Sequence, residues 1–350
     1  MTEIPPLYDL ETYDYELPQE LIAQYPPKER SESRLLVLNR QDGSLVHHTR
    51  FGEIERYFRP GDLLVINDSR VFPARLYGRK PTGGTVEILL LKLPEKGEAV
   101  PALYRGKRMR PGLELSFGEG LRGKVLEILE GGKIKILLET PKENLLDVIH
   151  RVGRVPLPPY IKRTPEAEDL FRYQTVYAKK PGSVAAPTAG FHFTEDLLER
   201  LRQRGVHILA ITLHVGYGTF APVKTKDIRK HRLHEEYVEI SPEVAEEINR
   251  AKAEGRAVFA VGTTTLRTLE FVALKTGRVE AFSGWCDLYI YPGFEFKVVD
   301  HLITNFHLPK SSLFILVAAF AGIEMIKRAY REAIRKKYRF FSYGDAMLIL

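Results

Sequence analysis

The sequence predicts an α/β protein whose main domain is interrupted by a small antiparallel β-domain. Apolar strands alternate with amphipathic helices towards both ends of the chain, whereas residues 74–140 carry short β-rich runs separated by glycine turns. The proline-rich stretch at 151–163 favours an extended return linker. We therefore expect 1–70 and 151–350 to form the two segments of the main domain, with the inserted domain at 71–150.

The main domain has clear strand and helix signals. Its predicted strands are the apolar, β-branched runs "GDLLVIND" (61–68), "VHILAITL" (206–213) and "AVFAVG" (257–262). Thr194 is placed to cap a helix that Gly205 ends, and Ser241 is placed to cap a second helix that Gly255 ends. Strand, helix, strand, helix is the order typical of an α/β fold.

The inserted domain has a different sequence pattern. Its glycine turns supply the positive backbone φ that tight hairpins need. A set of short strands joined in this way predicts an antiparallel barrel or sandwich. The strands expected are "ARLYGRK", "TVEILLLKL", "AVPALYRG", "LELSF", "GKVLEILE" and "KIKILLE".

Composition narrows the class of protein. With 350 residues, 44% of them hydrophobic, the chain can bury a substantial core. Cys286 is the only cysteine, so an internal disulfide and a cysteine-rich zinc site are excluded. The acidic N-terminus lacks the features of a secretory signal, and the longest apolar run, "LFILVAAFAG", is too short to span a bilayer. We expect a cytoplasmic protein without membrane contact.

The charge favours a polyanionic partner. The formal net charge is +7 and the isoelectric point is near 9.2. Two stretches, 104–112 and 160–182, interleave basic and aromatic residues in the manner of surfaces that bind phosphates and stack on unpaired bases. A solvated face with ordinary surface tyrosines is the alternative for each stretch alone. The candidate RNA contacts are Arg105, Lys107, Arg108, Lys162, Arg163 and Arg172.

Three histidines occur in similar turns. His192 in "TAGFHFT", His214 in "TLHVGYG" and His307 in "ITNFHLPKSS" each stand beside glycine, threonine or asparagine at an expected strand end or helix start. Such edges hold ligands in α/β proteins, and histidine titrates near neutrality, which suits acid–base work. A packed, satisfied histidine is the alternative. No histidine pair has HExxH spacing, so we expect no metal site.

A second candidate site is the strand-to-helix turn in "AVFAVGTTTLRTLEF". Free N–H groups at a helix start, three hydroxyls and a nearby arginine can receive a carboxylate or phosphate. The turn is neither a P-loop nor a dinucleotide fingerprint, and a simple threonine-capped helix is the alternative. The residues are Thr263, Thr264, Thr265 and Arg267. Near the C-terminus, Asp345 either binds a ligand or caps a turn.

Several long motifs extend over essentially the whole sequence. They include "INDSRVFPARLYGRK", "RYQTVYAKKPGSVAAPTAGFHFT", "TLHVGYGTFAPV", "AVGTTTLRTLE", "YPGFEFKVVDHLITNFHLPKSSLFILVAAFAG" and "YRFFSYGDAMLIL". In these motifs and in their order the chain resembles the S-adenosylmethionine:tRNA ribosyltransferase-isomerases of queuosine biosynthesis.

The resemblance implies a fold and a reaction. The fold is a barrel-like α/β main domain with an inserted small antiparallel β-barrel. The reaction transfers and isomerises the ribosyl group of S-adenosylmethionine onto 7-aminomethyl-7-deazaguanine in the tRNA anticodon, giving epoxyqueuosine and releasing adenine and methionine. S-adenosylmethionine is then consumed as a substrate, so no cofactor is expected. We expect a monomer with tRNA and S-adenosylmethionine as partners.

This chemistry needs several titratable groups, since adenine must be protonated as it leaves and protons must be removed beside the sulfonium and from the attacking amine. The candidates for acid, base or orienting group are His192, His214, His307, Glu236 and Asp345, and those for donor binding are Thr263, Thr264, Thr265, Arg267, Gly190 and Gly216. Cys286 stands where the family often has threonine, so we do not expect a thiol nucleophile.

Two rival functions remain open from the sequence. A non-catalytic RNA-binding protein is disfavoured because it does not need so many Gly, Thr and His turns at strand ends. An ordinary methyltransferase is disfavoured because "LLVIND" leads into "SRVFPAR" and not into a glycine-rich loop.

Overall fold

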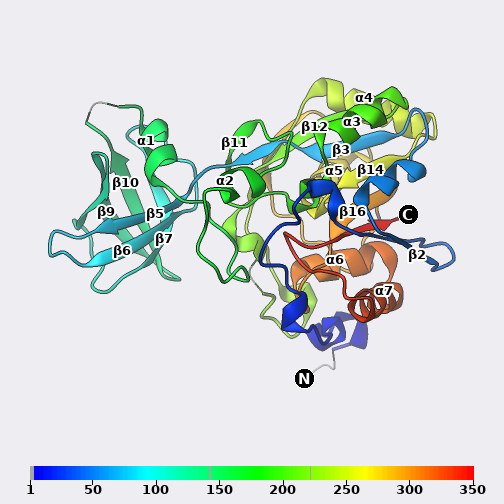
Figure 1. The fold of residues 1–350 in the computed structure, drawn as a ribbon, viewed down its shortest axis with the longest axis horizontal. Helices are drawn as coiled ribbons and strands as arrows, with labels where there is room; N and C mark the ends of the chain where they lie inside the picture. The colour runs from blue at the N-terminus through cyan, green and yellow to red at the C-terminus, as the bar shows by residue number, and fades with distance from the viewer. Residues whose placement is uncertain (1–3, 142, 221) are drawn as a thin grey trace.

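A nine-stranded mixed sheet forms the main part of the protein, and a closed six-stranded antiparallel barrel forms the smaller part (Figure 1). The computed structural model describes residues 4–141, 143–220 and 222–350. The α/β class with an inserted antiparallel barrel is therefore confirmed. Within the described residues, hydrogen bonding does not close the large sheet, which ends at one edge strand on each side.

The centre of the large sheet is parallel. Strands β12, β3, β14 and β16 run side by side in the same direction, and β13 joins β12 antiparallel. In spatial order the strands are β15 (Phe282–Cys286), β13 (Glu236–Ile240), β12 (His207–Leu213), β3 (Leu63–Asn67), β14 (Val258–Val261), β16 (His301–Asn305), β17 (Ala346–Ile349), β1 (Leu35–Leu38) and β2 (Leu45–His48). Parallel strands need helical crossovers, which explains the strand and helix alternation of the sequence.

Helices cover both faces of this sheet. On β3, Leu63 and Val65 belong to one apolar cluster, whereas Leu64 and Ile66 belong to the cluster on the opposite face. A strand buried on both faces is a continuous apolar run, as residues 63–66 of β3 are before the strand ends at Asn67. The helices are α3 (Glu195–Gln203) on the second face and α4 (Pro242–Ala253), α5 (Thr263–Thr276), α6 (Ser312–Ala321) and α7 (Ile323–Arg335) on the first.

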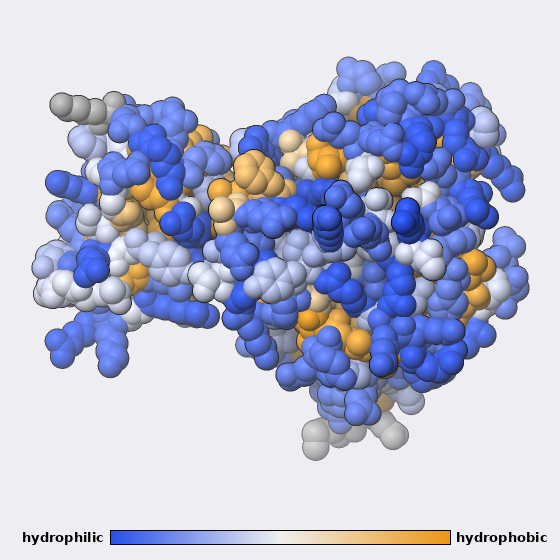
Figure 2. All heavy atoms as spheres, viewed as in Figure 1, coloured by the Kyte–Doolittle hydropathy of each residue, from blue (hydrophilic) through white to orange (hydrophobic). Residues whose placement is uncertain are grey.

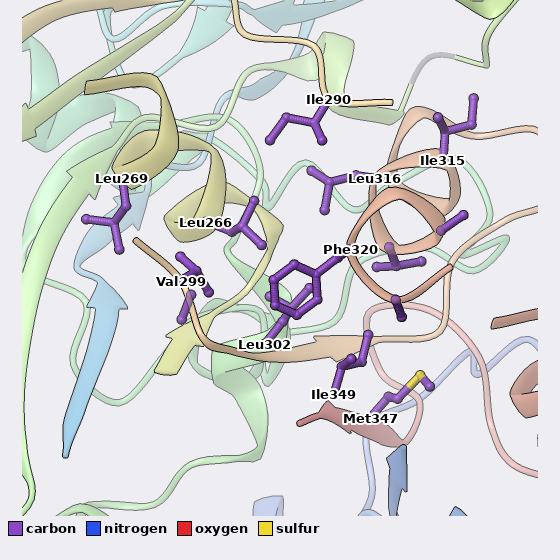
Figure 3. Close-up of a cluster of buried hydrophobic side chains, with 14 of the residues drawn as sticks. Leu266, Leu269, Ile290, Val299, Leu302, Ile315, Leu316, Phe320, Met347 and Ile349 are labelled. Atoms are coloured by element: carbon purple, nitrogen blue, oxygen red, sulfur yellow. The ribbon is translucent and has the colours of Figure 1, made fainter. Parts of the chain in front are cut away.

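The larger core cluster lies between the sheet and the helices α5 and α6. Figure 3 shows Leu266 of α5 and Phe320 of α6 meeting Leu302 of β16, with Ile349 of β17 beside them. Each such side chain that is fully buried contributes about 1.5–3 kcal/mol. Helix α6 is the "LFILVAAFAG" run, which is a core helix as expected. In the described part of the chain, no helix is long and apolar enough to cross a membrane.

Sequence signals for helix ends hold in the structure. The Thr194 hydroxyl accepts a hydrogen bond from the Leu197 N–H at 3.1 Å, and Gly205 has a φ of 82° beyond the end of α3. Ser241 caps α4 in the same way. The N-terminal segment was not anticipated: it forms short 3-10 helices that pack on the main domain, including η2 (Leu10–Tyr13).

The inserted barrel begins soon after β3 of the large sheet. A short parallel pair, β4 (Ser69–Val71) with β11 (Lys180–Ser183), stands where the chain leaves the main domain and returns. Helix α1 (Leu145–Val152) packs on the barrel through Val148 and Ile149. The barrel strands are β5 (Arg75–Arg79), β6 (Thr85–Leu90), β7 (Ala99–Arg105), β8 (Glu114–Gly118), β9 (Leu121–Leu129) and β10 (Lys133–Glu139).

Candidate active site

A cavity of about 70 Å³, with both polar and apolar side chains in its wall, lies at the carboxyl edge of the parallel strands. Thr263 and Thr264, which follow β14, line its wall. The end of β16 contributes Thr304 and Asn305, and His307 follows two residues later. Apolar side chains, among them those of Phe306, Leu308 and Phe341, complete the wall. Parallel sheets bind ligands at this edge, since loops and helix N-termini gather there.

The start of helix α5 faces this cavity. Gly262 precedes the helix with a φ of 88°, and no described side chain caps the first turn. Thr263 and Thr264 line the cavity, and the Thr264 hydroxyl accepts a hydrogen bond from the Asn67 amide at 3.5 Å. Thr265 points elsewhere, because its hydroxyl donates to the Val261 carbonyl at 2.8 Å. The first turn therefore offers an anion or a hydroxylated ligand two threonines, and not three.

His192 is buried behind the cavity wall. Its Nδ1 lies 2.7 Å from the Ser33 hydroxyl and its Nε2 lies 3.2 Å from Oδ1 of Asn305. The ring packs on Phe51 with centroids 5.1 Å apart. His192 is not among the residues that line the cavity, whereas Asn305 is. His192 thus reaches the cavity through Asn305.

The hydrogen bonds assign the tautomer of His192. The Asn305 amide nitrogen donates to the Phe341 carbonyl at 3.0 Å, so Oδ1 faces the imidazole and Nε2 carries the proton. Nδ1 then accepts from the Ser33 hydroxyl. Burial lowers the pKa of His192 to about 4, so the ring is neutral at pH 7. Because this neutral ring uses both nitrogens in hydrogen bonds, it holds the Ser33 hydroxyl and the Asn305 amide in place.

His307 lines the cavity itself. Its Nε2 lies 2.8 Å from the Thr304 hydroxyl, and its backbone N–H donates to the Tyr330 hydroxyl at 2.9 Å. The Tyr15 hydroxyl donates to its carbonyl. Burial lowers the pKa of His307 to about 3. Of the three histidines, His307 is the one on the cavity surface, and it presents a neutral imidazole.

A smaller cavity of about 30 Å³ adjoins the first, and Thr219 and Leu313 line both. In it, Arg267 donates from Nη1 to Glu236 at 2.7 Å, with both side chains about 95% buried. Glu236 also accepts from the Gly216 N–H at 2.9 Å and from the Thr219 hydroxyl at 2.7 Å. The structure therefore brings the predicted residues Glu236, Arg267 and Gly216 together.

His214 lies outside both cavities. Its ring stacks on Tyr237 at 6.1 Å and covers Gly182, where a side chain would come within 2.7 Å of the imidazole. Burial lowers its pKa, and its Nδ1 has no hydrogen-bond partner among the described residues. Its nearest charges are those of Glu239, Asp68 and Lys180.

The contacts of Asp345 and Gly190 are with other parts of the protein and indicate structural roles. Asp345 accepts from the Arg34 N–H and the Arg339 N–H, each at 2.8 Å, and so fixes the approach to the last strand. It lines neither cavity. At Gly190, an added side chain would meet the Tyr177 hydroxyl at 2.1 Å, so the glycine permits close packing.

The predicted RNA contacts divide into two groups. Arg105, Lys107, Arg108 and Lys162 are exposed. Arg163 instead holds Asp169 with two hydrogen bonds of 2.7 Å, and Arg172 donates to the backbone carbonyls of Pro27 and Lys28. These two guanidiniums are used within the protein.

An open cleft of about 590 Å³ lies between the barrel and the return linker. Arg105 and Lys162 line it from opposite sides, together with the tyrosines Tyr77, Tyr104 and Tyr217. Figure 2 shows that hydrophilic side chains predominate on the viewed face of both parts. Sequence reasoning did not single out Tyr77 or Tyr217, because nothing in their local sequence marks them as neighbours.

Sequence reasoning also missed Asn305 and Ser33. Asn305 stands two residues before His307, so its place in that turn was the available signal. Ser33 gives no such signal, since it lies 159 residues from His192. Among the residues that the structure describes, no group of three or more histidine, cysteine, aspartate or glutamate side chains is placed to hold a metal ion.

An α/β sheet with two cavities at its carboxyl edge is the architecture in which α/β proteins bind small ligands. The chain belongs to the family described as queuosine biosynthesis protein, whose model matches residues 10–349. The resemblance seen in the sequence is thus confirmed.

Named relatives agree over nearly the whole chain. The chain is 53% identical to the S-adenosylmethionine:tRNA ribosyltransferase-isomerase of Aquifex aeolicus, over 97% of this chain and 99% of that protein. It is 52% identical to the enzyme of the same name from Nitratidesulfovibrio vulgaris, over 97% of each chain. A crystal structure of S-adenosylmethionine tRNA ribosyltransferase from Thermotoga maritima is 39% identical and covers 97% of this chain and 100% of that one, with a TM-score of 0.56.

Proposed function

We propose that this protein is an S-adenosylmethionine:tRNA ribosyltransferase-isomerase. It transfers and isomerises the ribosyl group of S-adenosylmethionine onto the aminomethyl nitrogen of 7-aminomethyl-7-deazaguanine in tRNA. Epoxyqueuosine-tRNA, adenine and methionine are the products. The observation that carries the proposal is the near full-length identity of 53% to an enzyme of that name.

The two adjoining cavities suit the donor. We assign the ribose and adenine to the larger cavity, where Thr263, Thr264 and the uncapped start of α5 offer hydrogen bonds to hydroxyls and ring nitrogens. We assign the methionine carboxylate to Arg267 in the smaller cavity, because a buried guanidinium binds carboxylates strongly. The reacting ribose then lies close to His307.

The neutral state of His307 limits its role. An imidazole whose pKa is about 3 is neutral at pH 7 and a weak base, so of acid, base and orienting group it serves as the hydrogen-bond partner that orients the reacting ribose. His192 acts through Asn305 and is a positioning residue. His214 and Asp345 lie outside the cavities, and we assign them to the support of the walls.

We further propose that tRNA lies across the cleft between barrel and linker. Arg105, Lys107, Arg108 and Lys162 would contact phosphates, and the cleft tyrosines would stack on unpaired bases. Arg163 and Arg172 would shape this surface from within. The protein is proposed to act as a cytoplasmic monomer without a cofactor, which light scattering and turnover after treatment with a chelator would test.

One incubation tests the reaction. The protein is mixed with S-adenosylmethionine and tRNA that carries the deazaguanine base, and the small products are identified by mass spectrometry. Adenine and methionine support ribosyl transfer. S-adenosylhomocysteine would indicate methyl transfer, and the absence of any product would indicate an RNA-binding protein. Alanine substitution of His192, His214 and His307 in turn completes the test; normal turnover by all three variants would contradict the assigned roles.

A further inference from the structure

We infer that the smaller cavity is a receptor for the zwitterionic head of an α-amino acid, in which Tyr289 and Glu236 act together with Arg267, and that it binds free L-methionine as well as the donor. The inference rests on the proposed function, since methionine is the part of the donor that carries this head. It adds Tyr289 as a binding residue and predicts that the product methionine competes with the donor.

Two buried donors in this cavity lack partners. Arg267 uses Nε for the Leu288 carbonyl at 3.0 Å and Nη1 for Glu236, while Nη2 has no hydrogen-bond partner among the described residues. The Tyr289 hydroxyl is buried and likewise without a partner in the described part of the chain. Both residues line the cavity. Buried polar groups are normally satisfied, so this pair indicates a ligand that accepts hydrogen bonds.

The two donors are linked through one short segment of the chain, residues 288–289. Arg267 binds the Leu288 carbonyl, and Tyr289 is the next residue in the chain. His231 packs edge-on against the Tyr289 ring at 5.1 Å, which fixes its direction. Burial raises the pKa of Tyr289, so its hydroxyl keeps its proton and remains a donor.

The charged residues that line the smaller cavity favour a zwitterionic ligand. Glu235 and Glu236 line the cavity on the same strand end, against the single guanidinium of Arg267. A phosphate dianion would meet two carboxylates, whereas an α-amino acid offers its carboxylate to Arg267 and Tyr289 and its ammonium to Glu236. Glu236 retains acceptor capacity on Oε2, where Arg267 is the one partner among the described residues. The volume of about 30 Å³ is room for roughly two waters, so it takes the carboxylate, while the ammonium at Glu236 and the side chain of the amino acid lie towards Thr219 and Leu313, which line both cavities.

Calorimetry with the intact protein tests the receptor. The probes are L-methionine, L-methioninamide, which lacks the carboxylate, and 4-(methylthio)butanoate, which lacks the amine. We expect L-methionine to bind and both analogues to bind at least about tenfold more weakly, since each loses a charge-assisted hydrogen bond. Failure of L-methionine to bind at millimolar concentration, or equal affinity for the analogues, overturns the inference.

Tyr289→Phe is the informative variant. Its hydroxyl has no partner in the described protein, so removal costs no internal hydrogen bond and the fold is retained. We expect about tenfold weaker methionine binding from the loss of one bond to a charged group. Tyr57→Phe is the matched control, because it removes a hydroxyl that bonds His48 on another part of the surface. Equal methionine affinity of Tyr289→Phe and the wild type overturns the assignment.

The donor reaction separates this inference from the proposed function. In turnover assays, added L-methionine should inhibit wild type competitively with S-adenosylmethionine, and Tyr289→Phe should need about tenfold more of it, the same factor as in binding. A protein that releases adenine and methionine but shows no such competition supports the function and overturns the receptor. A protein that binds methionine through Tyr289 but forms no product supports the receptor and overturns the function.

Discussion

Nε2 of His192 donates a hydrogen bond to Oδ1 of Asn305 over 3.2 Å, and so links a histidine outside the larger cavity to a side chain on its wall. Ser33 holds the opposite nitrogen at 2.7 Å. The chain from Ser33 through His192 to Asn305 leaves the imidazole without a free nitrogen. His192 therefore sets the direction of the Asn305 amide.

The low pKa of His192 makes stability depend on pH. Burial lowers the pKa to about 4, so the unfolded chain binds a proton at higher pH than the folded chain. Stability is retained above about pH 6.5 and falls as the pH drops towards 4, by about 2–3 kcal/mol for this group at pH 4.5. Urea denaturation at pH 7.5 and 4.5 should show a smaller difference for His192→Gln. An unchanged difference would contradict the assignment; His48→Gln, at a partly exposed histidine bonded to Tyr57, is the control.

Much of the fold was predictable from local sequence. Residues 63–66 of β3 and 313–321 of the core helix α6 are unbroken apolar runs, and Thr194 and Ser241 cap helices because their hydroxyls fit the first-turn N–H groups. The order of the strands in space was not predictable, since β17 enters between β1 and β16 through contacts that no local pattern encodes.

The site was predictable in part. The turns with Thr263, Thr264 and His307 meet at one cavity because parallel strands end at the same edge of a sheet. It was not predictable that Arg163 binds groups within the protein, because a sequence does not show which arginines face solvent. Its partners are Asp169, the Gln24 carbonyl and the Tyr25 ring. The Ser33 contact depends on tertiary structure for the same reason.

Substitution of His307 should affect turnover more than donor binding. His307→Ala removes the neutral imidazole from the cavity wall, and loss of a positioned hydrogen-bonding group at the reacting centre costs about 100-fold or more in kcat. The KM for S-adenosylmethionine should change much less. Steady-state release of adenine measures both. His207→Ala changes a half-exposed histidine paired with Glu247 and should leave kcat unchanged. A His307→Ala enzyme with normal kcat would contradict the role.

The buried pair of Glu236 and Arg267 should be strongly coupled. Each side chain is about 95% buried, so removal of one partner leaves an uncompensated charge and costs about 3–5 kcal/mol. A double-mutant cycle with Glu236→Gln and Arg267→Met, followed by urea denaturation, measures the coupling. The exposed pair Glu199 and Arg202 in α3 is the control and should give about 0–1 kcal/mol. Equal coupling in the two pairs would show that burial does not matter here.

Neighbouring residues Lys162 and Arg163 should respond differently to substitution. Lys162 is exposed in the cleft, so Lys162→Ala should leave stability unchanged and reduce the salt slope of tRNA binding by about 1, as the loss of one phosphate contact does. Arg163→Ala should instead lower the unfolding free energy, because Asp169 is left buried and unpaired and the packing on the Tyr25 ring is lost. Filter binding across a range of salt concentrations and urea denaturation separate the two effects. Arg56→Ala, an exposed arginine on η5 (Phe51–Tyr57), is the control for the slope. If Lys162→Ala and Arg56→Ala give the same slope, the cleft does not carry the phosphate contacts, and tRNA binds on another surface.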